Sequence, residues 1–270
     1  MTRLVNIAIG LILSTILSAC ASNGGSQTTT AAPSSSLPAT AVTKTSSALS
    51  SSTSALKPIP EQQDRSSYHQ LGKNDFDRMT DMEIRENTES LRILMLKLYK
   101  RNPHELQKST SDPAEKMVDW VFDGETQHHF KFDSINNLQG TDAIFLAFKP
   151  EYTGDRVLPF IVGMQTMLLK AHGGKTDFYL TDSIDPQNIY NMARNIEICA
   201  WKLANARDEN GVLYLISNQI NDQDRNLSFE REFGKMIGRT DFYAIALAEK
   251  SQRLITRVMQ NLATALFFAF

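Results

Sequence analysis

The sequence contains little cysteine and no excess of charge of either sign. Only Cys20 and Cys199 occur among its 270 residues, too few for a disulfide framework. Its 28 Lys and Arg residues nearly balance its 30 Asp and Glu residues, giving a net charge of −2, and the two signs are interspersed. A protein that binds nucleic acid usually carries a basic patch, so we expect no nucleic-acid partner.

Common catalytic motifs are also missing. Neither Gly-x-Ser-x-Gly nor His-Glu-x-x-His occurs, which removes the usual signatures of two hydrolase classes. Gly174-Lys175-Thr176 looks like the end of a phosphate-binding loop, but Leu169 stands where that motif needs glycine. We therefore expect no cofactor, and we lean towards a protein that is not an enzyme.

The longest apolar run lies near the N-terminus, from Leu4 to Leu17, directly after the basic Arg3. A helix that crosses a bilayer needs about 20 apolar residues, so this run is too short for a span and is typical of a secretory leader. It ends in Leu17-Ser18-Ala19-Cys20. An ordinary signal peptide with an incidental cysteine is the alternative interpretation of this pattern.

The four residues Leu17-Ser18-Ala19-Cys20 resemble the lipobox of bacterial lipoproteins. The resemblance implies that residues 1–19 are a signal peptide and that Cys20 becomes the lipidated N-terminus, with diacylglycerol on sulfur and an acyl chain on the amine. Ala21 and Ser22 follow, where lipoproteins kept at the inner membrane usually carry Asp. The resemblance thus implies an outer-membrane protein that faces the periplasm, with the inner membrane or the cell surface as alternatives.

Composition divides the rest of the chain in two. Residues 20–59 are rich in Ser, Thr and Ala, which bury too little apolar surface to offset the entropy of ordering, so we expect a disordered tether. Such a tether would let the following domain reach a partner in the cell-wall layer, and the composition fits equally well a linker that only holds the domain clear of the lipid headgroups. Residues 60–270 have the length of one sizeable domain or two small ones, and we interpret them as one helical periplasmic domain.

Apolar residues recur with helical spacing almost throughout residues 60–270, which predicts an all-α, multi-helix bundle. Thr80 and Glu83 suggest a capping box at the start of the first helix, and Thr153 suggests another helix start. Three Asx-Pro pairs predict further starts: Asn102-Pro103, Asp112-Pro113 and Asp185-Pro186. The last predicted helix begins near Thr240 and presents Leu247, Ser251, Leu254, Val258, Leu262 and Ala265. Two short segments, residues 127–132 and 212–216, could be strand or loop.

One six-residue pattern occurs twice. Gly174-Lys175-Thr176-Asp177-Phe178-Tyr179 is echoed by Gly238-Arg239-Thr240-Asp241-Phe242-Tyr243. An internal duplication of a helix-turn-helix unit would explain the echo, and so would two unrelated helix corners, each with a terminating glycine and a capping Thr or Asp. Either explanation places Phe178, Tyr179, Phe242 and Tyr243 at corners, which makes them candidate interaction residues.

Few polar residues suggest a reactive site. His128, His129 and Asp133 are weak candidates for metal ligands, because adjacent histidines seldom converge on one ion and no second pair occurs. Cys199 falls on the apolar face of its predicted helix, where a buried structural cysteine is expected rather than a reactive thiol.

Three functional classes remain open. The first is a non-enzymatic helical adaptor or scaffold in the cell envelope, held by lipid at Cys20 and bound to an envelope protein, and the missing catalytic motifs favour it. The second is a cell-wall enzyme that uses paired carboxylates, for which Asp177 and Asp241 are candidates. The third is a carrier of an apolar ligand, suggested by Met164, Met167 and the Phe-rich C-terminus.

The lipobox generates a direct prediction. We expect Cys20→Ser to abolish incorporation of a radiolabelled fatty acid and to release the protein from the membrane fraction or leave an uncleaved precursor, because no other described feature attaches it to lipid. Metabolic labelling followed by membrane fractionation measures both effects. Fatty-acid label persisting in the Cys20→Ser protein would contradict the assignment.

Overall fold

The computed structural model describes residues 73–179, 182–220, 225–257 and 261–268. The predicted signal peptide, the lipidated Cys20 and the predicted tether lie outside these residues. Within them, no helix is both long and apolar enough to cross a membrane.

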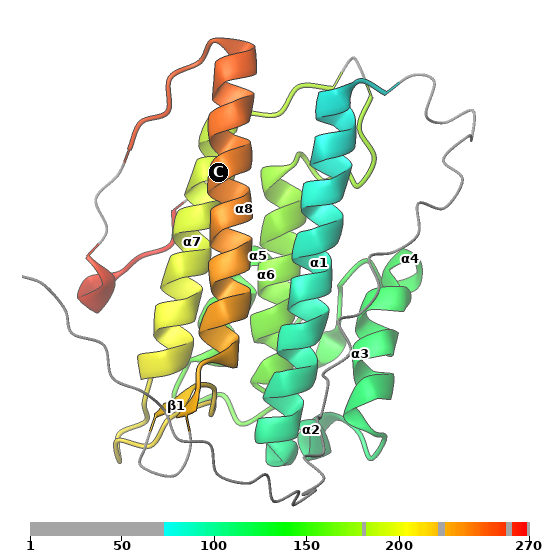
Figure 1. Ribbon diagram of the computed structural model, residues 1–270. Helices are drawn as coiled ribbons and strands as arrows, with labels where there is room; N and C mark the ends of the chain where they lie inside the picture. Colours follow the sequence, from blue (N-terminus) through cyan, green and yellow to red (C-terminus); the bar gives the residue numbers. More distant parts are fainter. Residues whose placement is uncertain (1–72, 180–181, 221–224, 258–260, 269–270) are drawn as a thin grey trace, which may run out of the picture. The chain divides into compact units, whose positions relative to one another are not determined.

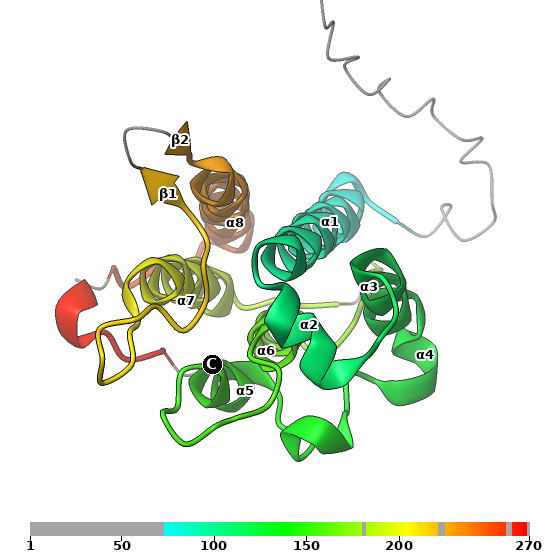
Figure 2. The same ribbon diagram turned by 90° about the horizontal axis from the view of Figure 1, so that it is seen from below.

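Four long helices form a bundle, as Figure 1 shows in side view and Figure 2 from below. They are α1 (Asp75–Arg101), α6 (Val157–Ala171), α7 (Pro186–Asn205) and α8 (Ser228–Ser251). Both α1 and α7 pack against α6 and α8, so the four helices close into a ring, and neighbours in that ring run antiparallel. The prediction of an all-α, multi-helix fold is confirmed.

Shorter elements surround this bundle. Helix α3 (Ala114–Asp123) packs against α1, and α5 (Gly140–Ala147) packs against α6. A Cβ atom on Gly163 of α6 would lie 2.6 Å from Cγ1 of Ile144, so only glycine permits this close approach of α5. The remaining described elements are α2 (Pro103–Ser109), α4 (Glu125–His128), the 3₁₀-helices Asp133–Ile135 and Leu262–Thr264, and the two-residue antiparallel strands β1 (Gln219–Ile220) and β2 (Arg225–Asn226).

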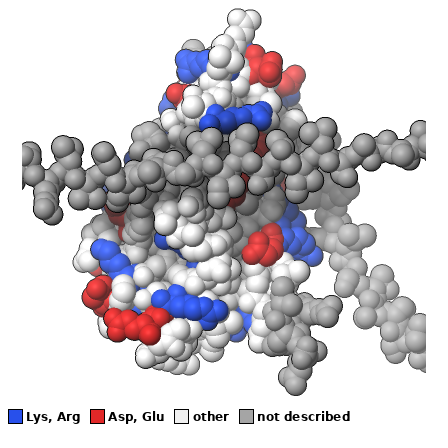
Figure 3. All heavy atoms as spheres, turned by 90° about the vertical axis from the view of Figure 1, so that its left-hand side faces the viewer, with Lys and Arg blue, Asp and Glu red and all other residues white. Residues whose placement is uncertain are grey.

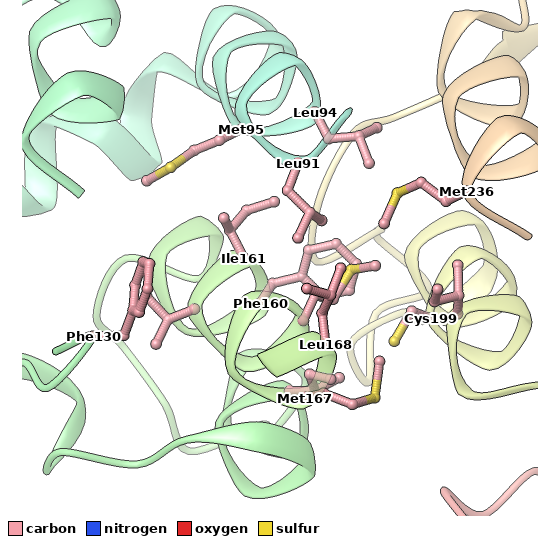
Figure 4. Close-up of a cluster of buried hydrophobic side chains, with 14 of the residues drawn as sticks. Leu91, Leu94, Met95, Phe130, Phe160, Ile161, Met167, Leu168, Cys199 and Met236 are labelled. Atoms are coloured by element: carbon pink, nitrogen blue, oxygen red, sulfur yellow. The ribbon is translucent and has the colours of Figure 1, made fainter. Parts of the chain in front are cut away.

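The core lies where α1, α6, α7 and α8 meet. Figure 4 shows Leu91 and Leu94 of α1, Phe160 of α6, Cys199 of α7 and Met236 of α8 converging there, each no more than 1% exposed. The methionine-rich face of α6 belongs to the same cluster of buried side chains. These methionines therefore fill the core, as methionine commonly does in irregular gaps.

Proline marks the helix starts correctly, but the predicted caps differ in detail. Helices α2 and α7 begin at Pro103 and Pro186, and the Asp185 side chain accepts a hydrogen bond of 2.9 Å from the Gln187 N–H, as predicted. The prediction that the Asn102 side chain caps α2 is wrong, because it makes no capping hydrogen bond there. Helix α3 begins at Ala114 without a side-chain cap. At α6 the predicted cap Thr153 is wrong: Oδ1 of Asp155 accepts from the first N–H groups of the helix instead.

The first helix begins earlier than predicted. Its capping box consists of Asn74 and Asp77, which exchange two hydrogen bonds of 2.9 Å. The predicted box residues Thr80 and Glu83 lie inside α1 and are buried. The spacing of a Thr and a Glu three residues apart was misleading, because these two side chains form hydrogen bonds with α8 inside the core instead of capping a helix.

The prediction for the last helix is wrong at both ends. Helix α8 begins at Ser228 and ends at Ser251, and Gln252 adopts a left-handed backbone conformation with φ of 53°. Beyond it Leu254 is 97% exposed, and the following described residues hold only one 3₁₀ turn. Contacts with α7 hold this tail: the Asn195 side chain exchanges hydrogen bonds of 2.9 and 2.7 Å with the backbone of Phe268.

The two ambiguous segments are mostly irregular. Residues 127–128 complete α4, and the chain then turns through left-handed residues at His129 and Phe130. Residues 212–216 form a loop with a single bridge, between Arg207 and Leu213.

Candidate functional site

The two copies of the repeated pattern have different local structures. Gly174–Tyr179 follows α6, which ends at Ala171 and is succeeded by Gly173 and Gly174 with φ values of +77° and +76°. Gly238–Tyr243 lies inside α8. The prediction of two helix corners, and with it a duplicated helix-turn-helix unit, is therefore wrong for the second copy. Nothing terminates α8 there, because Gly238 adopts helical geometry.

One aromatic residue from each copy nevertheless reaches the same buried side chain, His172. The Tyr243 ring stacks on the imidazole with ring centres 5.9 Å apart, and the Phe178 ring meets it edge-on at 6.2 Å. Phe178 and Tyr243 are each 2% exposed. These two candidate interaction residues are therefore core residues, whereas Tyr179 and Phe242 are exposed.

His172 faces a buried carboxylate. Its Nε2 atom lies 3.0 Å from Oε2 of Glu83, although the two groups are not aligned as a hydrogen bond. Nδ1 of His172 lies 2.9 Å from the Leu168 carbonyl, which can only accept, so Nδ1 carries a proton. The pair thus places an imidazole nitrogen beside a carboxyl oxygen inside the core.

Further polar groups complete this buried cluster, and they join α1 to α8. Thr240 donates a hydrogen bond of 2.9 Å to Oε1 of Glu83, and Asn87 donates to the same oxygen. Arg239 in turn donates to the Asn87 side chain. One turn away, the Thr80 and Tyr243 hydroxyls lie 2.5 Å apart, and burial is the main cause of the raised pKa of Tyr243. Buried polar groups with such partners hold helices in one arrangement.

The buried cluster lies apart from the open pockets found among the described residues. Two large open pockets of about 790 and 680 Å³ and a third of about 380 Å³ occur in the described part of the protein, and none of the three is lined by Glu83 or His172. The contacts that the cluster does make join α1 to α8 within the core.

The larger pocket lies between α5, α6 and the turn after α4. Glu125, His129, Lys170 and Phe268 are among its lining residues, and burial raises the pKa of Glu125.

No three His, Cys, Asp or Glu residues of the described chain gather where they could hold a metal ion. His128 accepts a hydrogen bond of 2.9 Å from the Phe130 N–H, and its Nε2 lies 3.2 Å from the Trp120 carbonyl, so both its nitrogens are already engaged. Asp133 begins a 3₁₀-helix and accepts from Asn137.

The pocket of about 680 Å³ contains one buried acid, Asp155. Burial raises its pKa, and its Oδ2 accepts hydrogen bonds of 2.6 Å from Tyr99 and 2.8 Å from Ser109. Its Oδ1 caps α6. The adjacent Tyr152 has its pKa raised to about 12, mainly by burial. Asp155 thus has a full set of donors, which suits a structural carboxylate better than a free acid or base.

The other candidate reactive residues are engaged or buried. Asp177 pairs with Lys73 at 3.1 Å, whereas Asp241 pairs with Arg194 at 2.6 Å, so the two acids belong to different ion pairs. Cys199 is fully buried, and burial raises the pKa of its thiol, which confirms the predicted structural cysteine.

The most exposed apolar surface on a long helix lies on α8. Phe242 is 68% exposed and Ile245 is 51% exposed. They belong to a row of six exposed residues that we call the α8 seam: Arg231, Lys235, Gly238, Phe242, Ile245 and Glu249. The sequence prediction missed this seam because it began the helix at Thr240, after the first three members. A continuous helical pattern from residue 228 was the signal that could have revealed it.

Charge does not single out a surface on the face that Figure 3 shows. On that face, basic and acidic side chains lie interspersed among uncharged ones.

Comparisons with known protein families, with curated proteins and with solved structures give no match. The functional argument therefore rests on the molecule itself.

The exposure of the two repeated phenylalanines predicts opposite effects on stability. We expect Phe178→Ala to lower the free energy of unfolding by about 3–5 kcal/mol, because it leaves a cavity beside His172. Phe242→Ala should change it by no more than about 0.5 kcal/mol, because the ring is largely solvated. Denaturant unfolding of both variants at low protein concentration measures the difference, and equal losses would contradict the structure.

The buried pair gives a second stability prediction. We expect Glu83→Leu and His172→Leu each to cost about 3–5 kcal/mol, because each leaves a buried polar partner unpaired. The double variant should cost less than the sum of the two single variants. A double-mutant cycle by denaturant unfolding tests this coupling, and strictly additive losses would argue against a direct interaction.

Proposed function

We propose that this protein is a lipid-anchored component of the bacterial cell envelope that acts as a non-enzymatic helical adaptor, with the α8 seam as its docking face. One observation carries the proposal: Phe242 and Ile245 lie one helical turn apart on α8, and each is more than half exposed. The lipobox-like Leu17-Ser18-Ala19-Cys20 supports the anchor and the location.

The shape of the seam suits a protein partner. Gly238 precedes Phe242 by about one turn, and a Cβ atom placed on it would meet nothing within 4 Å. A glycine in a solvated helix position costs about 1 kcal/mol relative to alanine, which favours a role beyond helix formation. A large exposed aromatic is the kind of anchor that dominates protein interfaces, and the open space at Gly238 leaves room beside it for a partner.

The two alternative functions have weaker support. A carboxylate-based enzyme needs two free acids facing a groove, whereas Asp155, Asp177 and Asp241 are each engaged by donors or cations. A carrier of apolar ligands needs an enclosed apolar cavity, whereas Met164 and Met167 are packed in the core. The adaptor hypothesis requires neither feature.

Photo-crosslinking in living cells tests the proposed docking face. We expect full-length protein with a photo-reactive amino acid at Ile245 to give a discrete crosslinked species, and Phe242→Glu to reduce that species by about tenfold or more, because it places a charge in the interface. Leu254→Glu is the matched control, since Leu254 is exposed but lies outside the seam. Crosslinking that is unchanged by Phe242→Glu would overturn the proposal.

A further inference from the structure

The α8 seam has the spacing of a helix-pairing face. Its six members follow one another at steps of four, three, four, three and four residues, from Arg231 to Glu249, and all six are exposed. Alternating steps of three and four are the repeat by which two helices pack along their length. The opposite side of α8 faces the bundle core through residues such as Phe233, Met236 and Tyr243. The seam therefore lies on the solvent side of α8, and no described residue covers it.

The order of residues along the seam is self-complementary. Its N-terminal end is basic, with Arg231 and Lys235, and its C-terminal end is acidic, with Glu249. Rotating a second α8 by two-fold symmetry about an axis at residue 240 sets Arg231 opposite Glu249. The same rotation sets Gly238 opposite Phe242 and Lys235 opposite Ile245.

We propose that the α8 seam binds the α8 seam of a second copy of this chain in an antiparallel, two-fold symmetric pair. This inference rests on the proposed docking role of the same surface. Each Phe242 ring lies over the open backbone at Gly238 of the other copy, so the largest side chain of the seam faces its glycine twice in the interface. An Arg231–Glu249 ion pair closes the interface at both ends.

The charged residues of the seam can make these contacts without losing strong interactions within their own copy. The Arg231 side chain is 69% exposed, and its Nε lies 3.7 Å from Glu232, so it can turn to a new partner. Lys235 holds its ammonium 3.1 Å from Glu232 of its own chain, which leaves its aliphatic stem to cover Ile245 of the other copy.

A parallel pair would be much less favourable. It would set Arg231 against Arg231 and Glu249 against Glu249, and like charges across an interface select against that orientation. It would also set Phe242 against Phe242 and leave two glycines facing each other across a gap. The sizes and the charges of the seam side chains therefore both favour the antiparallel orientation.

Charge reversal tests the pairing. Two differently tagged full-length copies are expressed together, solubilised in mild detergent and purified through one tag. We expect Arg231→Glu in both copies, or Glu249→Arg in both, to lower recovery of the second tag by about tenfold, because each creates two like-charge contacts. The variant with both changes in the same chain should restore recovery, since an antiparallel pair again matches opposite charges.

Controls separate pairing from folding and from other partners. Arg231 and Glu249 are exposed, so the variants should unfold like the parent, and Leu254→Glu should not lower recovery. Failure of the double variant to recover, or normal recovery in both single variants, would overturn the self-pairing. Seam-dependent crosslinking of Ile245 to a different protein, with no co-purification of the two tags, would also overturn it but would leave the adaptor proposal standing.

Discussion

The buried cluster around Glu83 is the constraint on which the arrangement of α1 and α8 depends. Apolar contacts between helices tolerate small displacements, because dispersion and hydrophobic forces have little directional preference. Hydrogen bonds do not tolerate them. Sliding α8 by one turn along α1 would take the Thr240 hydroxyl away from Oε1 of Glu83 and leave a buried acid without that donor.

The same cluster explains which side of α8 faces solvent. Thr240 and Tyr243 must point towards α1 to reach Glu83 and Thr80, and Asp241 points towards Arg194 of α7. With these directions occupied, helical geometry turns Gly238, Phe242 and Ile245 outward. The exposed seam is thus a geometric consequence of the buried polar cluster. The same buried contacts determine which side of α8 faces the core and which side faces solvent.

Much of the fold could be predicted from local signals. The apolar spacing after Asp185-Pro186 and the glycines after Ala171 mark α7 and the end of α6, because capping and helical amphipathicity act within a few residues. The burial of Cys199 followed from its place on such a face. Predictions failed where one pattern had two physical meanings: Thr80 and Glu83 resemble a cap, and the apolar residues after Ser251 resemble a helix.

The sequence by itself determined the helical class, the helix starts at Pro103 and Pro186, the balance of charge and the lipobox-like N-terminal pattern, since each depends on residues that are neighbours in the chain. Tertiary structure alone decided that Phe178 and Tyr243 meet at His172 while Phe242 stays in solvent. It also decided that the apolar tail after Ser251 lies against Asn195 instead of extending α8. These outcomes depend on which buried groups find partners among residues far away in the chain, and local sequence patterns do not reveal that pairing.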